Sequence, residues 1–334
     1  MNLKKAITFI LLLHLFTCEI REYKNNYYIY VNDETNSSED INDTNVLVDV
    51  SSSKKYSCMK YNLSFSTDND EGDIYIPTDT GTQFYPIILL QGSDLSKDNY
   101  NKISELICNN GFIVVTFDHY KESFSGKHLY AEQNATNKVY YKLLEISNLK
   151  DSILFGRMKK DKFILLGHSY GAACGLFMIG NECKWPFCSE TYERPYQLSG
   201  GIFYGISLKS PFGEKYYQIK NDNIPILLIA GDNDGVIKYE HAEKTLASIQ
   251  SQPKFLVKLK NANHYAINDE NPPKGADADK NIQQLNQETG LEIISSLTTS
   301  FIIEYVIKEI NTHGHFEKTV NKFIEYIELK KDFY

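Results

Sequence analysis

Short apolar segments that alternate with helical segments are the feature that most constrains the fold of this 334-residue chain. The sequence predicts strands at residues 73–76, 85–90, 112–117, 162–166, 201–204, 226–230 and 255–259. Helices are predicted at residues 98–109, 138–155, 172–179, 240–249, 291–310 and 316–329. Continuous apolar strands that alternate with helices are typical of a mostly parallel sheet with helices on both faces. The expected fold class is therefore α/β.

The chain has room for one large domain, which we expect at residues 61–311. Residues 19–60 are predicted to be a flexible polar leader, because Asn, Asp, Ser, Glu and Tyr dominate there without periodicity. Residues 312–334 are predicted to form a C-terminal amphipathic helix and tail. The net charge of −8 excludes a general nucleic-acid binder, which needs a basic surface.

The N-terminus carries the signature of export. Lys4 and Lys5 precede an apolar run at residues 6–16, which has the length of a signal-peptide core and is too short to span a bilayer. We expect a signal peptide at residues 1–18 and a protein that is secreted or in the lumen of the secretory pathway. An uncleaved anchor or a buried helix is the alternative. No later apolar run predicts a membrane span in the mature chain.

N-glycosylation sequons give modest further support for export, because an Asn-rich chain also acquires them by chance. They begin at Asn36, Asn42, Asn62 and Asn134.

Five cysteines remain if Cys18 leaves with the signal peptide, and an odd number forbids complete internal pairing. Cys183 and Cys188 are close enough in sequence to form a small disulfide loop, but the sequence does not settle whether they pair. Cys108 and Cys174 lie in apolar helical patterns and are expected to be buried thiols. No spacing of Cys and His resembles a zinc site, so no metal is expected.

The segment Gly167-His168-Ser169-Tyr170-Gly171 carries the strongest chemical signal. It lies between a predicted strand and a predicted helix, where a serine must turn sharply out of the strand, and this explains the two glycines. Ser169 is the predicted nucleophile, and its hydroxyl would stand at a helix N-terminus that favours an oxyanion. A turn serine without catalytic role is the alternative. His168 would point away, with a packing or hydrogen-bonding role.

A serine nucleophile needs a base, and the base needs a carboxylate that sets its tautomer. Both are expected at the carboxyl ends of parallel strands, where chemistry collects in open α/β sheets. Asp232 and Asp234 directly follow the predicted strand at residues 226–230, whereas Asp222 precedes it and lies at the wrong end.

Four histidines follow these carboxylates: His241, His264, His313 and His315. His264 is the predicted base, because it follows the strand at residues 255–259 in a loop expected beside the acid. His241 starts a helix away from the site, and the other two follow the long C-terminal helix in a polar loop.

Two backbone N–H groups are needed to hold an oxyanion. One predicted donor is Tyr170, the residue after the nucleophile. The other is Ser93, in the loop after the strand at residues 85–90, where Gly92 lets the backbone approach.

Together these segments resemble the α/β-hydrolase superfamily, closest to the group of cutinase-like polyester hydrolases, platelet-activating-factor acetylhydrolases and dienelactone hydrolase-like esterases. The resemblance covers about residues 70–310 and rests on residues 73–81, 85–93, 110–119, 167–171, 225–236 and 261–265. It implies an α/β-hydrolase fold and selects Asp234 as the acid, with Asp232 supporting the turn through backbone hydrogen bonds. Many of these enzymes have His-Gly or Pro-Gly where this chain has Gln91-Gly92, and the backbone donor survives that change.

The resulting hypothesis is a secreted serine esterase in which Ser169, Asp234 and His264 form a triad and an acyl-enzyme, without metal or organic cofactor. The expected substrate is a small-molecule, lipid or polyester ester, and the acyl length and oligomeric state stay open. The alternatives are a phospholipid-directed acetylhydrolase or lipase, a peptidase or acyltransferase, and a binding protein on a catalytically dead hydrolase fold.

Residues 181–217 are rich in aromatic side chains that are candidates for an acyl pocket or a small lid. Trp185 in this stretch and Tyr204 at a strand end are the predicted pocket residues. Ordinary surface packing in a tyrosine-rich chain is the alternative.

Overall fold

The computed structural model describes residues 17–23, 26–32, 55–65, 70–123, 126–308 and 312–331. The chain divides into two compact units, Met1–Ser51 and Ser52–Tyr334. In the first unit, β1 (Thr17–Tyr23) and β2 (Asn26–Asn32) pair as antiparallel strands. The predicted signal peptide lies outside the described residues except for Thr17 and Cys18, which begin β1. The sequons at Asn36 and Asn42 also lie outside them.

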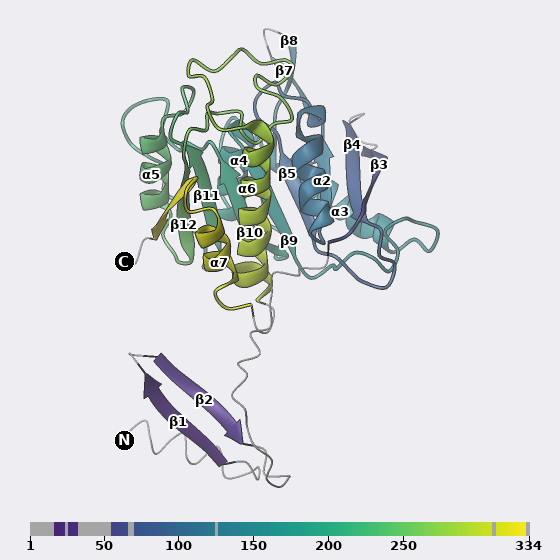
Figure 1. The fold of residues 1–334 in the computed structure, drawn as a ribbon. Coiled ribbons are helices and arrows are strands. Elements are labelled where there is room, and N and C mark those ends of the chain that lie inside the picture. The colour runs from purple at the N-terminus through teal and green to yellow at the C-terminus, as the bar shows by residue number, and fades with distance from the viewer. Residues whose placement is uncertain are drawn as a thin grey trace. The chain divides into compact units, whose positions relative to one another are not determined.

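A nine-stranded sheet forms the centre of the second unit, in the order β13-β12-β11-β10-β9-β5-β6-β4-β3 (Figure 1). Its strands are β3 (Cys58–Phe65), β4 (Asp70–Pro77), β5 (Pro86–Leu90), β6 (Ile113–Phe117), β9 (Phe163–His168), β10 (Leu198–Tyr204), β11 (Ile226–Gly231), β12 (Lys254–Leu259) and β13 (Ile327–Lys331). The six strands from β12 to β6 are parallel, and antiparallel strands complete both edges. The predicted α/β class with a mostly parallel sheet is confirmed.

Helices cover both faces of the sheet, so its central strands are apolar on both sides. One face carries α3 (Gln133–Ser147), α4 (Tyr170–Ile179) and α5 (Tyr239–Ser248). The other carries α2 (Asn101–Asn109), α6 (Gln287–Phe301) and α7 (His315–Lys322) (Figure 1). In β9, Phe163 and Leu165 join the first core, whereas Ile164 and Leu166 join the second.

Shorter elements connect these layers. The 3-10 turn η2 (Lys97–Tyr100) precedes α2, and the π-helical turn η3 (Ile302–Ile307) continues α6. The strands β7 (Tyr120–Ser123) and β8 (Gly126–Leu129) form a separate antiparallel pair after β6.

Within the described part of the chain, one helix, Gln287–Ile307, is long and apolar enough to cross a membrane by length and composition. Of its apolar window, 67% is buried inside the structure. Leu291, Ile294 and Leu297 belong to the core against the sheet. We therefore interpret this segment as a core helix.

Two predicted helices have different extents in the structure. The helix predicted at residues 138–155 ends at Ser147, and the helix predicted at residues 316–329 ends at Lys322. The chain then enters β13, where buried Ile327 and partly buried Leu329 flank exposed Glu328. This period-2 pattern fits an edge strand that pairs with β12.

Two disulfides stabilise the second unit. Cys183 and Cys188 pair, and Cys58 on β3 pairs with Cys108 at the end of α2. The prediction that Cys108 is a free thiol is wrong, because β3 brings a distant cysteine against α2. Cys174 is a buried free thiol as predicted. Disulfides are typical of oxidising compartments such as the secretory pathway.

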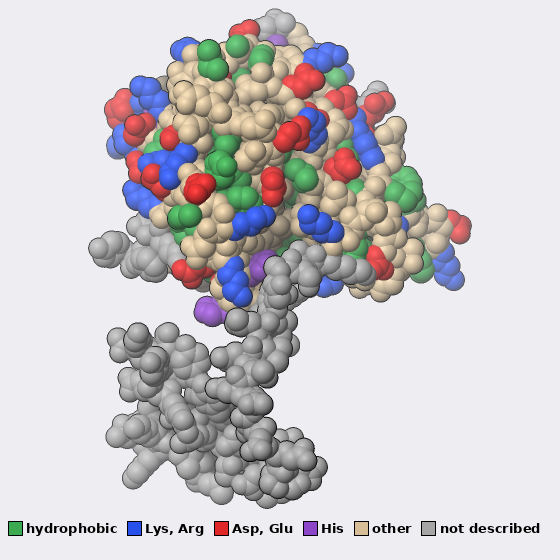
Figure 2. Space-filling view, in the orientation of Figure 1, with side chains coloured by type: hydrophobic (Ala, Val, Ile, Leu, Met, Phe, Trp, Pro, Cys, Tyr) green, Lys and Arg blue, Asp and Glu red, His purple; other side chains and the backbone are tan. Residues whose placement is uncertain are grey.

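Charged side chains of both signs are interspersed on the face of the second unit that Figure 2 shows. Among the described residues drawn there, the view shows no broad basic stripe of the kind that binds phosphate backbones.

Candidate active site

Ser169 lies in a sharp turn between the carboxyl end of β9 and the start of α4. Its φ of 55° and ψ of −114° lie outside the regions that non-glycine residues prefer. A Cβ atom at Gly167 would be 2.7 Å from Cα of Ala172, and one at Gly171 would be 2.2 Å from the carbonyl oxygen of Leu90. Only glycine fits at both positions, which explains the Gly-x-Ser-x-Gly spacing.

A chain of hydrogen bonds links Ser169 to His264 and Asp234. The distance from Ser169 Oγ to His264 Nε2 is 2.9 Å, and the distance from His264 Nδ1 to Asp234 Oδ2 is 2.8 Å. Because an ionised carboxylate only accepts, the proton of the neutral imidazole is on Nδ1, and Nε2 accepts from the Ser169 hydroxyl. The three side chains predicted as nucleophile, acid and base are therefore brought together. Their catalytic roles stay predictions.

The carboxylate of Asp234 is buried and accepts three hydrogen bonds. Its Oδ1 accepts from the backbone N–H groups of Val236 at 2.8 Å and Ile237 at 2.6 Å, while its Oδ2 accepts from His264. Asp234 and His264 are 4% and 2% exposed, respectively. A carboxylate that accepts three hydrogen bonds is fixed in position and can orient the imidazole.

His168 does not contact Ser169 through its ring but joins two loops of the site. Its Nε2–H donates to the carbonyl of His264 at 3.0 Å, and its Nδ1 accepts from the hydroxyl of Tyr100 at 2.9 Å. That hydroxyl in turn accepts from the N–H of Gly92 at 2.8 Å. Burial, and then the nearby His264, lower the pKa of His168 well below its usual value, so the ring is neutral. The hydrogen-bonding role expected for His168 is confirmed.

Asp279 is a further residue of the site that the sequence does not reveal. Its Oδ2 accepts from the backbone N–H of His264 at 3.0 Å, and its Oδ1 accepts from those of Gly235 at 3.0 Å and Asn281 at 2.8 Å. One carboxylate thus holds the loops of both His264 and Asp234. Asp279 lies in the polar segment between β12 and α6, where no motif or periodicity marks it.

The predicted oxyanion donors lie on adjacent loops. Tyr170 is the first residue of α4, and Ser93 follows β5, the neighbour of β9. The loops are in close contact, because a Cβ at Gly171 would also be 2.6 Å from the carbonyl oxygen of Gln91. The N–H of Asp94 donates to the carbonyl of Leu129, which ties the Ser93 loop to β8. Whether these N–H groups hold an oxyanion stays a prediction.

The two predicted pocket residues have different surroundings. Trp185 is 78% exposed and lines an apolar cavity. Tyr204 is fully buried, and its hydroxyl donates to the carbonyl of Asn263 at 2.6 Å. Tyr204 therefore supports the loop of His264 rather than lining that cavity.

The other candidate acids and bases lie elsewhere. Asp232 accepts from the N–H of Asn261 at 2.6 Å, which confirms its expected role in backbone hydrogen bonding. His241 contacts Tyr216, and the side chain of His313 is fully exposed.

No group of three or more His, Cys, Asp or Glu residues in the described ranges is arranged to hold a metal ion. A comparison of the chain with known protein families and with curated protein sequences finds no match. Inferences about function therefore rest on the geometry of the site itself.

Proposed function

We propose that this chain is a secreted serine hydrolase of the α/β-hydrolase fold that cleaves carboxylic esters. The observation that carries the proposal is the chain of hydrogen bonds from Ser169 Oγ through His264 to Asp234, at 2.9 and 2.8 Å. All three side chains follow the carboxyl ends of parallel strands, and they occur in the order Ser, Asp, His. The two disulfides and the N-terminal sequence support a secretory location.

In the proposed mechanism, the hydroxyl of Ser169 attacks the ester carbonyl while Nε2 of His264 accepts its proton. Asp234 stabilises the imidazolium that forms and keeps Nε2 directed at the serine. The N–H groups of Ser93 and Tyr170 are the proposed donors to the oxyanion. His264 then protonates the departing alkoxide, which leaves an acyl-enzyme on Ser169.

Hydrolysis of the acyl-enzyme repeats these roles with water as the nucleophile. His264 removes a proton from water, the resulting hydroxide attacks the acyl carbonyl, and the proton returns to the oxygen of Ser169. The balance is one ester and one water converted to one acid and one alcohol.

The test is hydrolysis of p-nitrophenyl acetate by the secreted protein, together with labelling by a fluorophosphonate, which reacts with activated serines. Ser169→Ala is expected to abolish labelling and to lower kcat by about 10⁴-fold or more. Ser199→Ala is the control, because Ser199 lies near the amino end of β10, and it is expected to keep both signals. A Ser169→Ala protein with full activity would contradict the proposal.

A further inference from the structure

An apolar cavity of about 180 Å³ lies beside α4. Three segments provide its walls: α4, the loop closed by the disulfide between Cys183 and Cys188, and the loop that follows β10. The main apolar side chains around it are Ala173, Phe177, Trp185, Phe187, Leu208 and Phe212.

One wall of the cavity lies one helical turn from the nucleophile. Ala173 lies one helical turn after Ser169, and its N–H donates to the carbonyl of Ser169 at 3.2 Å. The ring of Phe187 contacts the ring of Tyr170, with 4.5 Å between centroids. A chain attached to a carbonyl at Ser169 therefore has an apolar space within one turn of the reacting atom.

Another wall of the cavity follows a turn that lies beside the base. Ser207 and Leu208 line it, and they directly follow the turn at Gly205 and Ile206. A Cβ at Gly205 would lie 3.0 Å from the ring of His264. The wall opposite α4 thus leaves the sheet beside the imidazole.

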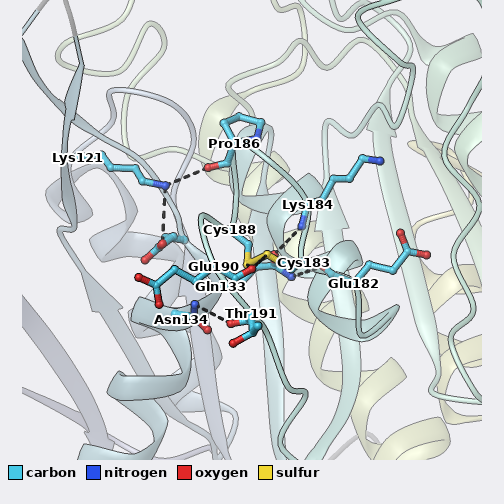
Figure 3. The surroundings of a disulfide bond; sticks show 11 residues. Lys121, Gln133, Asn134, Glu182, Cys183, Lys184, Pro186, Cys188, Glu190 and Thr191 are labelled. Atoms are coloured by element: carbon cyan, nitrogen blue, oxygen red, sulfur yellow. Dashed lines mark hydrogen bonds and ion pairs between the residues drawn. A yellow bond between two sulfur atoms is a disulfide. The ribbon is translucent and has the colours of Figure 1, made fainter.

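The loop that carries Trp185 and Phe187 is held in place by more than its disulfide (Figure 3). The side-chain amide of Gln133 donates to the carbonyl of Glu182 at 2.8 Å and accepts from the N–H of Lys184 at 3.3 Å. Lys121 donates to the carbonyl of Pro186 at 3.1 Å. The cavity wall is therefore preformed, which lowers the entropic cost of binding.

The chemistry of the walls fits an uncharged hydrocarbon chain. The ammonium of Lys184 lies 4.0 Å over the ring of Tyr217, and Lys209 pairs with Glu214 at 2.9 Å. Trp185 and Phe212 are 78% and 88% exposed, so they leave an apolar entrance open to solvent. Both lysines that line the cavity thus already interact with another side chain.

The volume sets the length of the chain. An apolar protein cavity of about 150 Å³ binds benzene, which has six carbon atoms. A cavity of about 180 Å³ therefore holds a chain of about six to eight carbons.

We propose that this cavity binds the acyl chain of medium-length carboxylic esters. This proposal rests on the proposed function of Ser169. Within the cavity, each added methylene group raises kcat/KM about fourfold, because its burial stabilises the bound chain. Beyond about eight carbons the gain stops, since further carbons leave the cavity.

The experiment measures kcat/KM for p-nitrophenyl esters from C2 to C16 with the full-length protein. The wild type is expected to rise from C2 to C6 or C8 and then to level off. Ala173→Leu fills part of the cavity and is expected to lower the ratio of kcat/KM for the C6 ester to that for the C2 ester at least tenfold. This is the loss expected when about two methylene groups are no longer buried. Trp185→Ala changes an exposed side chain, so it avoids a folding defect, and is expected to lower the ratio about fourfold. Tyr196→Ala, which is 89% exposed outside the cavity, is the control and is expected to keep the ratio.

Two results would overturn the assignment of the cavity while leaving the esterase proposal intact. One is Ser169-dependent hydrolysis with equal kcat/KM from C2 to C8. The other is a continued rise to C16 that Trp185→Ala does not change, because such a chain would lie outside the cavity. The absence of both C2 hydrolysis and fluorophosphonate labelling would instead refute the proposed function.

Discussion

Replacing Gly171 by alanine tests whether the turn at Ser169 depends on the close approach of α4 to β5. A Cβ at this position would lie 2.2 Å from the carbonyl oxygen of Leu90 and 2.6 Å from that of Gln91, whereas real Cβ atoms essentially never come within 3.0 Å of another atom. Both obstacles are backbone atoms, which cannot rotate away. The start of α4 must therefore move by about 1 Å, as overpacked cores do when they accept an extra methyl group.

The expected cost is large for activity and moderate for stability. A displacement of about 1 Å at a reacting group lowers the rate about 100-fold. Overpacking destabilises the fold by about 1–3 kcal/mol. Gly171→Ala is therefore expected to fold, to hydrolyse p-nitrophenyl acetate about 100-fold more slowly, and to unfold at a lower urea concentration.

Gly180→Ala is the matched control, because Gly180 ends the same helix. Its φ is −67°, and its nearest contact for a Cβ is an ordinary 3.4 Å. Activity and stability are expected to stay near those of the wild type. A Gly171→Ala protein with wild-type activity and stability would refute the argument that the carbonyl of Leu90 fixes the turn.

Three further predictions concern groups that hold the site and the fold. Replacing both Cys58 and Cys108 by serine opens a loop with a sequence separation of 50 and is expected to cost about 4 kcal/mol of unfolding free energy; an unchanged urea midpoint would contradict it. Folding lowers the pKa of His168, so below pH of about 6.5 the unfolded chain binds a proton that the folded chain does not. As the pH falls through this range, the unfolding free energy of the wild type is therefore expected to decrease by about 1.4 kcal/mol per pH unit relative to that of His168→Gln. Parallel pH dependences of the two urea midpoints would argue against a neutral buried ring. Asp279→Asn weakens the support of the His264 loop and is expected to lower kcat by up to about 100-fold with little change in KM; loss of KM alone would instead indicate a substrate contact.

The sequence predicts the central strands and the candidate site because both leave local patterns. A strand buried on both faces is a continuous apolar run, as in β9 and β11. Ser169, Asp234 and His264 each directly follow such a run or the turn after it, and parallel strands bring their carboxyl ends to one edge. The structure places these three side chains within hydrogen-bonding distance.

The features that the sequence does not predict depend on contacts between distant segments. Cys108 lies in a helical pattern typical of a buried thiol, and nothing nearby indicates that β3 brings Cys58 against it. Tyr204 ends an apolar strand, but its hydroxyl donates to the carbonyl of Asn263, 59 residues later in the chain. Asp279 contacts backbone N–H groups, which have no residue-specific signature in a sequence.

The loop of His264 is held from two sides by groups of different character. On one side, Gly92, Tyr100 and His168 form a buried, uncharged relay of hydrogen bonds that ends at the carbonyl of His264. On the other side, Asp279 is partly exposed, so water can solvate the carboxylate that accepts from the N–H of His264. Hydrogen bonds protected from water resist local opening better than exposed ones. The segment of Asp279, rather than the buried relay, is therefore where loosening would first release the base from Ser169.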